Sequence, residues 1–144
     1  EFGFVFQQHF LINYLTVLEN VMVAAPQQDQ AHAAQARALL TDLGMGDKLH
    51  RLPYELSGGE RQRTAVARAM IHRPRIIFAD EPTGLLDRHN GLQVMALLRG
   101  YRKQGSLVAV THNPEILAEA DLVITLRDGQ ITNVQDRVAR VSAN

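Results

Sequence analysis

The sequence predicts an α/β fold with a mostly parallel sheet and a separate, mainly helical segment. Two unbroken apolar runs, at residues 76–79 and 107–110, predict buried strands at residues 75–80 and 107–111. A helical pattern at residues 88–103 lies between these two runs, whereas the first half of the chain is mainly helical in pattern. Alternation of strand and helix favours parallel strands joined by right-handed crossovers.

One short strand and two helices are predicted first. The strand formers at residues 2–6 predict a strand that ends in a polar loop. Thr16 and Glu19 have the spacing of a capping box, which predicts a helix to about Ala24. Leucines spaced for one helical face predict a second helix at residues 31–43.

Ser57, Gly58 and Gly59 open a third predicted helix, which ends near His72 because Pro74 follows. Ser57 and Glu60 again have capping-box spacing. Free backbone N–H groups and the helix dipole make such a helix start an anion site, and glycine permits close approach. The alternative is an ordinary capped helix start.

Short elements complete the chain after the strand at residues 107–111. They are a helix at residues 114–120 and two strands at 122–126 and 130–134, joined by a turn at Asp128 and Gly129.

Composition excludes several classes of protein. The 15 basic and 15 acidic residues give a formal net charge of zero, so the basic excess of a general nucleic-acid binder is absent. The chain has no cysteine, which excludes disulfides, thiolate metal sites and cysteine nucleophiles. No apolar run approaches the roughly 20 residues that span a bilayer, and the first residues do not resemble a signal peptide.

Two adjacent carboxylates, Asp80 and Glu81, follow the apolar run at residues 76–79. Ligands of open α/β folds bind beyond the carboxyl ends of strands, so both are candidate site residues. Asp80 could hold Mg²⁺ beside nucleotide phosphates, directly or through water, and Glu81 could orient or deprotonate an attacking water. The alternative is a solvated strand end followed by a turn.

Two further polar residues follow predicted strands. His112 comes directly after residues 107–111, where it could bond a phosphate oxygen, and Gln7 ends the first strand. Taken alone, a histidine after a strand is more often an ordinary loop residue, and Gln7 is only a polar residue that ends a strand.

Together these segments resemble the nucleotide-binding subunit of ATP-binding-cassette (ABC) transporters over essentially the whole chain. The segments occur in the order GFVFQ (3–7), LSGGERQR (56–63), FADEPTGLLD (78–87) and VTHN (110–113). The resemblance implies a partial P-loop NTPase-like core with an inserted helical subdomain. It places the core at residues 1–7 and 67–144, and the subdomain, with the Q-loop and the signature motif, at residues 8–66.

The resemblance also implies roles for individual residues. Glu81 becomes the general base and His112 the switch histidine, which are the two catalytic residues. Asp80 and Gln7 would hold Mg²⁺, partly through water. The residues expected to contact ATP are Gln7 of the Q-loop, Ser57, Gly58, Gly59 and Glu60 of the signature motif, Asp80 of Walker B and Asp87 of the D-loop.

Residues 15–21 (LTVLENV) and 79–84 (ADEPTG) resemble the lipoprotein-release and macrolide-export type of ATPase. Two positions depart from that subgroup. Asn13 stands where these relatives commonly have proline, and Leu85 stands where they commonly have asparagine.

The phosphate-binding P-loop of this family, Gly-x-x-x-x-Gly-Lys-Ser/Thr, does not occur in the sequence. Lys48 precedes leucine and Lys103 precedes glutamine, so neither is a P-loop lysine. We therefore expect this chain to be an N-terminally shortened form that binds MgATP weakly and does not hydrolyse it alone.

The resemblance implies a membrane permease and a second, head-to-tail ATPase subunit as partners, at the cytoplasmic face of the membrane, and no nucleic acid. Residues 9–23 are the expected permease contact, with Phe10, Leu11, Tyr14 and Leu15 lining it or, alternatively, forming the subdomain's own core. Uncovered apolar surface predicts self-association of the chain.

Two alternative functions remain open. The chain could be a non-catalytic module that lends its signature motif to a complete partner. It could also be a chromosome-maintenance or DNA-repair ATPase, although Gln7 and Ser57 are too close in sequence for the long coiled coil of those proteins.

Overall fold

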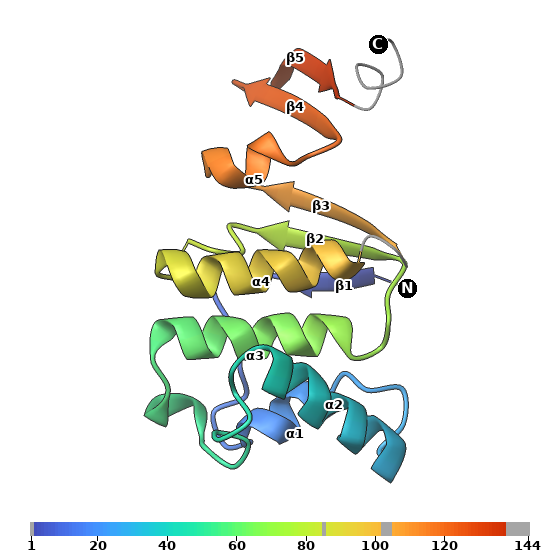
Figure 1. Cartoon of the computed structure of the whole chain (residues 1–144), viewed down its shortest axis with the longest axis vertical. Coiled ribbons are helices and arrows are strands. Elements are labelled where there is room, and N and C mark those ends of the chain that lie inside the picture. Colours follow the sequence, from blue (N-terminus) through green and yellow to red (C-terminus); the bar gives the residue numbers. More distant parts are fainter. Residues whose placement is uncertain (1, 85, 102–104, 138–144) are drawn as a thin grey trace. The chain divides into compact units, whose positions relative to one another are not determined.

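The computed structural model describes residues 2–84, 86–101 and 105–137. Contacts divide the chain into two units, Glu1–Val110 and Thr111–Asn144. The first contains β1 (Phe2–Val5), α1 (Val17–Met22), α2 (Gln30–Asp42), the 3₁₀ turn η1 (Pro53–Glu55), α3 (Gly58–Met70), β2 (Ile76–Asp80), α4 (Arg88–Tyr101) and β3 (Ser106–Val110) (Figure 1). The second contains α5 (Pro114–Ala118), β4 (Leu122–Arg127) and β5 (Gln130–Asp136).

Every predicted helix and strand is present, with ends that differ by a few residues. The helix predicted at residues 88–103 is described to Tyr101, and its last two positions lie outside the described residues, as does Leu85. The turn η1 was not predicted; it has proline at its first position, where the fixed φ of proline suits a helical turn.

The first unit contains a three-stranded parallel sheet in the order β1-β2-β3. Val5 pairs with Ala79, which in turn pairs with Ala109, so all three carboxyl ends lie at one edge. The predicted α/β fold with a parallel sheet is therefore confirmed. In the second unit β4 and β5 form an antiparallel hairpin. Asp128 and Gly129 make its turn with φ of 51° and 76°, as predicted.

Helices cover one face of the parallel sheet, because α3 packs on β1 and α4 packs on β3. Val5, Ile77 and Ala79 are buried on this face. The prediction that residues 107–111 form a buried strand was wrong, since Val108 and Val110 are 48% and 64% exposed. Alternate residues of a strand point to opposite faces, and within the described residues of the first unit no helix packs on the second face.

Helix α3 is the centre of the first unit, in contact with α1, α2, α4 and β1. Thr64, Ala65, Val66 and Ala67 on this helix are buried. Gly3 lies against it so closely that a Cβ atom would come within 2.5 Å of the carbonyl oxygen of Ala69. Glycine therefore permits the close approach of β1 to α3.

The uncovered face of the sheet is aromatic. Phe4 stacks on Phe78 with ring centroids 5.4 Å apart, and Phe2 meets Phe78 edge to face at 5.7 Å. Phe6 stacks on Phe4 and meets Phe10 edge to face. This aromatic face, defined as Phe2, Phe4, Phe6, Phe78, Val108 and Val110, is apolar surface of the kind that favours association.

Candidate functional site

The two predicted carboxylates lie at the carboxyl end of β2, the central strand. Asp80 is the exposed last residue of the strand, and Glu81 is half-buried. The backbone N–H of Glu81 donates to the carbonyl oxygen of Val110 at 2.9 Å. Glu81 has φ of 46°, a left-handed conformation that costs a non-glycine residue of order 1–3 kcal/mol. The turn after β2 is thus strained and is held by the neighbouring strand.

Gln7 reaches the same edge of the sheet. It follows β1, which runs parallel to β2 with Val5 opposite Ala79, and its side chain is exposed. A carboxylate and an amide oxygen at one edge suit Mg²⁺, which commonly takes one or two protein ligands and completes its shell with water and phosphates. Among residues 2–84, 86–101 and 105–137, no group of three His, Asp or Glu side chains could hold a metal ion.

The predicted anion site is the first turn of α3. Ser57 Oγ accepts from the backbone N–H of Glu60 at 3.3 Å, while the backbone N–H of Ser57 donates to Glu60 Oε2 at 2.8 Å. This capping box confirms the predicted local structure. No heavy atom lies within 4 Å of a Cβ built on Gly58. The first amide groups of a helix have no partner within it, so this end of α3 is open to an anion.

Glu60 is tied to this helix start as a carboxylate. Burial favours the neutral form, but hydrogen bonds from the backbone and side chain of Ser57, with Lys48 nearby, lower the pKa of Glu60 overall. Lys48 Nζ lies 3.5 Å from Glu60 Oε1. The capping box therefore forms with an ionised Glu60 at neutral pH.

Asp87 is engaged in local structure. It accepts a hydrogen bond from the backbone N–H of Asn90 at 3.1 Å and another from the Asn90 side chain. These hydrogen bonds, mainly the one from the Asn90 side chain and then the one from its backbone N–H, lower the pKa of Asp87. This carboxylate therefore caps the first turn of α4.

Gln62, which sequence reasoning missed, joins α3 to the turn after Glu81. Its side chain is 1% exposed, and Nε2 donates to the carbonyl oxygen of Pro82 at 3.2 Å. Its Oε1 atom is buried and has no hydrogen-bond partner among the residues that the structure describes. A glutamine within a helical pattern gives no sequence signal for such a contact.

Arg68, also missed, joins α3 to the segment after Gln7. Its guanidinium donates to the carbonyl oxygens of His9 and Phe10, both at 2.7 Å. Burial lowers the pKa of Arg68. The pKa of His9 is also lowered, mainly by burial and to a smaller extent by the positive charge of Arg61. A hydrogen bond to the Gly58 backbone acts on this pKa in the opposite direction but is weaker.

His112 lies in the second unit and is described only within it. Its side chain is exposed, and it precedes Asn113, whose Oδ1 accepts from the backbone N–H of Glu115 at 2.9 Å and caps α5. The structure thus brings Gln7, Asp80 and Glu81 to one sheet edge, while Ser57–Glu60 form a separate helix start.

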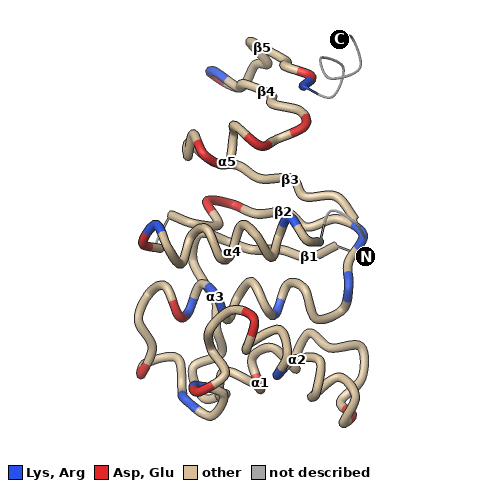
Figure 2. Tube along the Cα trace, viewed as in Figure 1, with Lys and Arg blue, Asp and Glu red and all other residues tan. Residues whose placement is uncertain are grey.

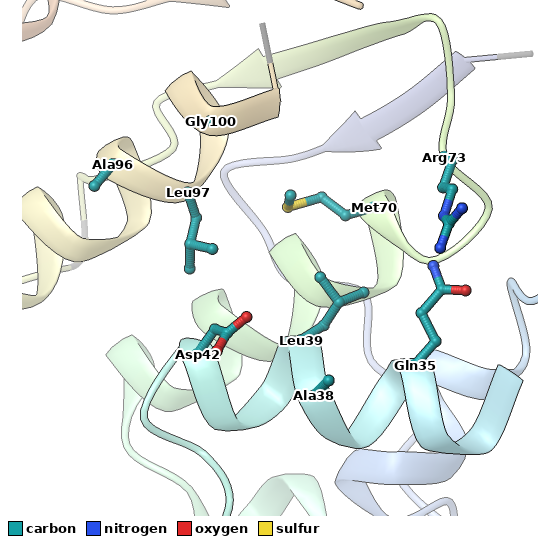
Figure 3. Close-up of a pocket in the computed structure, with 9 residues that line it drawn as sticks. All are labelled: Gln35, Ala38, Leu39, Asp42, Met70, Arg73, Ala96, Leu97 and Gly100. Atoms are coloured by element: carbon teal, nitrogen blue, oxygen red, sulfur yellow. The ribbon is translucent and has the colours of Figure 1, made fainter. Parts of the chain in front are cut away.

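A groove of about 580 Å³ lies elsewhere, among α2, the end of α3 and α4 (Figure 3). Its lining is Gln35, Ala38, Leu39, Asp42, Met70, Arg73, Ala96, Leu97 and Gly100. None of the predicted site residues lines it. Figure 2 shows acidic and basic residues interspersed along the trace rather than gathered as a basic stripe.

Comparisons with known proteins place the chain in a family. The family model described as "ABC transporter" matches residues 1–84. The ABC transporter ATP-binding protein MJ1508 of Methanocaldococcus jannaschii is 45% identical over 92% of this chain and 61% of its own length. The macrolide export ATP-binding/permease protein MacB of Wolinella succinogenes is 43% identical over 99% of this chain and 23% of its own length.

A solved structure agrees with these matches. The dimeric, post-hydrolysis ATP-binding cassette MJ0796, bound to ADP and Pi, superposes with a TM-score of 0.87 at 33% identity, over 95% of this chain and 63% of that chain. The chain thus spans less than two thirds of the length of these relatives. The predicted resemblance to the macrolide-export type is confirmed by MacB. Because the family model matches more than half of its residues, the chain belongs to the ABC transporter family of ATP-binding proteins.

Proposed function

We propose that this chain supplies the Walker B, signature and switch parts of an ATP-hydrolysing subunit that powers a membrane permease. The observation that carries the proposal is the position of Asp80 and Glu81 at the carboxyl end of the central strand, beside the segment that contains Gln7. The relative MJ0796, bound to ADP and Pi, supports nucleotide phosphates as the ligand.

Each site residue has one proposed role. Asp80 and Gln7 hold Mg²⁺, and Glu81 takes the proton of the attacking water. His112 donates to the terminal phosphate. Ser57 and Gly58, with Gly59 and Glu60, bind the nucleotide of a partner subunit, and Asp87 lies at the same dimer interface. These roles divide the chain into a core of residues 1–7 and 67–144 and a helical subdomain of residues 8–66.

The proposed permease contact is the surface formed by residues 9–23. Phe10, Tyr14 and Val23 are 64%, 81% and 53% exposed, whereas Val17 and Val21 are buried. The exposed aromatic rings therefore lie outside the subdomain's own core and are available to an apolar segment of a permease. No helix among the described residues is long and apolar enough to cross a membrane, and the proposed location is the cytoplasmic membrane face, beside the permease.

Alone, the chain is expected to bind MgATP weakly, because no P-loop lysine or P-loop backbone cradle is present in its sequence. Titration of the purified chain with a fluorescent ATP analogue and Mg²⁺ tests this, with Asp80→Asn as the matched variant. The expected result is no saturable binding in the micromolar range for either protein. Saturable micromolar binding that Asp80→Asn weakens would show that the Walker B edge holds nucleotide without a P-loop.

A second candidate function is a non-catalytic module that lends its signature helix to a complete ATPase subunit. The complete capping box at Ser57 and Glu60 favours it, because the helix start is formed without a P-loop. Mixing the chain with a complete homologous ATPase distinguishes the two. Increased turnover that Ser57→Ala abolishes would support the lending role.

Self-association of the chain is expected because the aromatic face is uncovered and both β1 and β3 have one unpaired edge within the described sheet. Multi-angle light scattering at micromolar concentration should give a mass above the 16.0 kDa of the monomer. Phe4→Ser should shift the mass toward the monomer, whereas Tyr54→Ser, a change at a 75% exposed ring outside this face, should not. A monomeric mass for the unchanged chain contradicts the prediction.

A further inference from the structure

Arg68 makes a contact that the proposed chemistry does not use. It lies on α3, about two turns after the last signature residue, Glu60, and reaches back to a segment almost sixty positions earlier in the chain. One terminal nitrogen of its guanidinium donates to the carbonyl oxygen of Phe10 and the other to that of His9, each at 2.7 Å. Two hydrogen bonds from one planar guanidinium fix the orientation of the bound backbone segment as well as its distance from Arg68.

The contact is partly shielded from water, since the hydrogen bond to His9 is partly buried and the one to Phe10 is exposed. Arg68 is half-buried, and no carboxylate within the described residues forms an ion pair with it. Backbone carbonyls are therefore its compensating partners, which makes the contact costly to break. Phe10, one of the two acceptors, has φ of 45°, so the backbone that Arg68 holds is in a conformation disfavoured for phenylalanine.

The segment held by Arg68 begins two residues after Gln7, and α3 begins directly after Ser57. A rearrangement of this segment thus requires either a broken guanidinium contact or a matching movement of α3. We propose that Arg68 is a positioning residue that couples the loop of Gln7 to the helix of the signature motif. Its consequence for nucleotide binding rests on the function proposed above, but the coupling itself does not.

Amide hydrogen exchange of the full chain, followed by NMR without nucleotide, tests the coupling. The reporters are the amides of Ile12 and Leu15, which donate to Asn20 Oδ1 and to the carbonyl oxygen of Ile12. The amide of Ile71, at the end of α3, reports on the helix itself. Arg68→Gln should accelerate exchange at Ile12 and Leu15 about tenfold, which is about threefold for each of two hydrogen bonds that are partly exposed to water, and leave Ile71 unchanged.

Two further variants make the result specific. Arg68→Lys keeps the charge and can bond one carbonyl, so it should restore slow exchange in part, about threefold above the unchanged chain. Arg37→Gln, the same change at an exposed arginine of α2, should have no effect at Ile12 or Leu15. If Arg68→Gln does not fold, Arg68→Lys alone decides the question.

Exchange at Ile12 and Leu15 that stays within about twofold of the unchanged chain in both Arg68 variants would overturn the proposal. Equal acceleration at Ile12, Leu15 and Ile71 would also overturn it, because Arg68 would then merely stabilise the unit as a whole. Since no nucleotide is used, a failure of this coupling is distinguishable from a failure of the proposed ATPase function.

Discussion

Glu81→Gln is expected to lower the rate of MgATP hydrolysis by about two to four orders of magnitude, the usual contribution of a general base. The protein for this measurement is a chimera in which the N-terminal part of the relative MJ1508, expected to contain the P-loop, precedes Glu1. Glu81 leaves the carboxyl end of β2 in a left-handed turn that the Val110 carbonyl holds, so the backbone that carries its carboxylate is fixed before any ligand arrives. Glutamine preserves the shape of this side chain but cannot accept the proton.

The matched control is Asp128→Asn, which removes a carboxylate by the same exchange in the turn of the β4–β5 hairpin. It should leave turnover unchanged. Steady-state phosphate release measures the rate, and the fluorescent nucleotide measures affinity, which Glu81→Gln should not weaken. Turnover near that of the unchanged chimera would show that Glu81 is not the base.

Local structure was predictable where the sequence contains a local rule. The Thr16–Glu19 and Ser57–Glu60 spacings predicted both capping boxes, and both are formed. The acidic end of β2 followed from an apolar run that stops at Asp80. Each of these features depends on residues within one turn or one strand, so no tertiary information is needed.

The burial of the sheet and the long-range contacts were not predictable. The apolar runs at residues 76–79 and 107–110 predict buried strands, yet Val108 and Val110 are exposed, since burial depends on which layers cover a strand. The contacts of Gln62 with Pro82 and of Arg68 with His9 join segments far apart in the chain. Their residue types alone favour an exposed helix surface, so only the fold identifies these partners.

Asn20→Ala is expected to lower the free energy of unfolding by roughly 3–5 kcal/mol, because this completely buried side chain makes four hydrogen bonds. The two N–H bonds of its Nδ2 are shared among the carbonyl oxygens of Ile12, Leu15 and Thr16, and its Oδ1 accepts from the backbone N–H of Ile12. Alanine would leave these backbone groups without partners in a partly buried site. Urea unfolding followed by far-UV circular dichroism measures the loss.

Asn13→Ala is the matched control, since Asn13 lies in the loop whose backbone Asn20 binds, with its own side chain exposed. It should change the free energy of unfolding by no more than about 0.5 kcal/mol. Asn20→Asp separates shape from hydrogen bonding, because aspartate keeps the size and the acceptor but loses the donor to three carbonyls. It should destabilise at least as much as alanine, since a carboxylate would face carbonyl oxygens in a buried site. A loss below about 1 kcal/mol for both variants would mean that water replaces the amide, and that packing of Val17 and Val21 holds this loop instead.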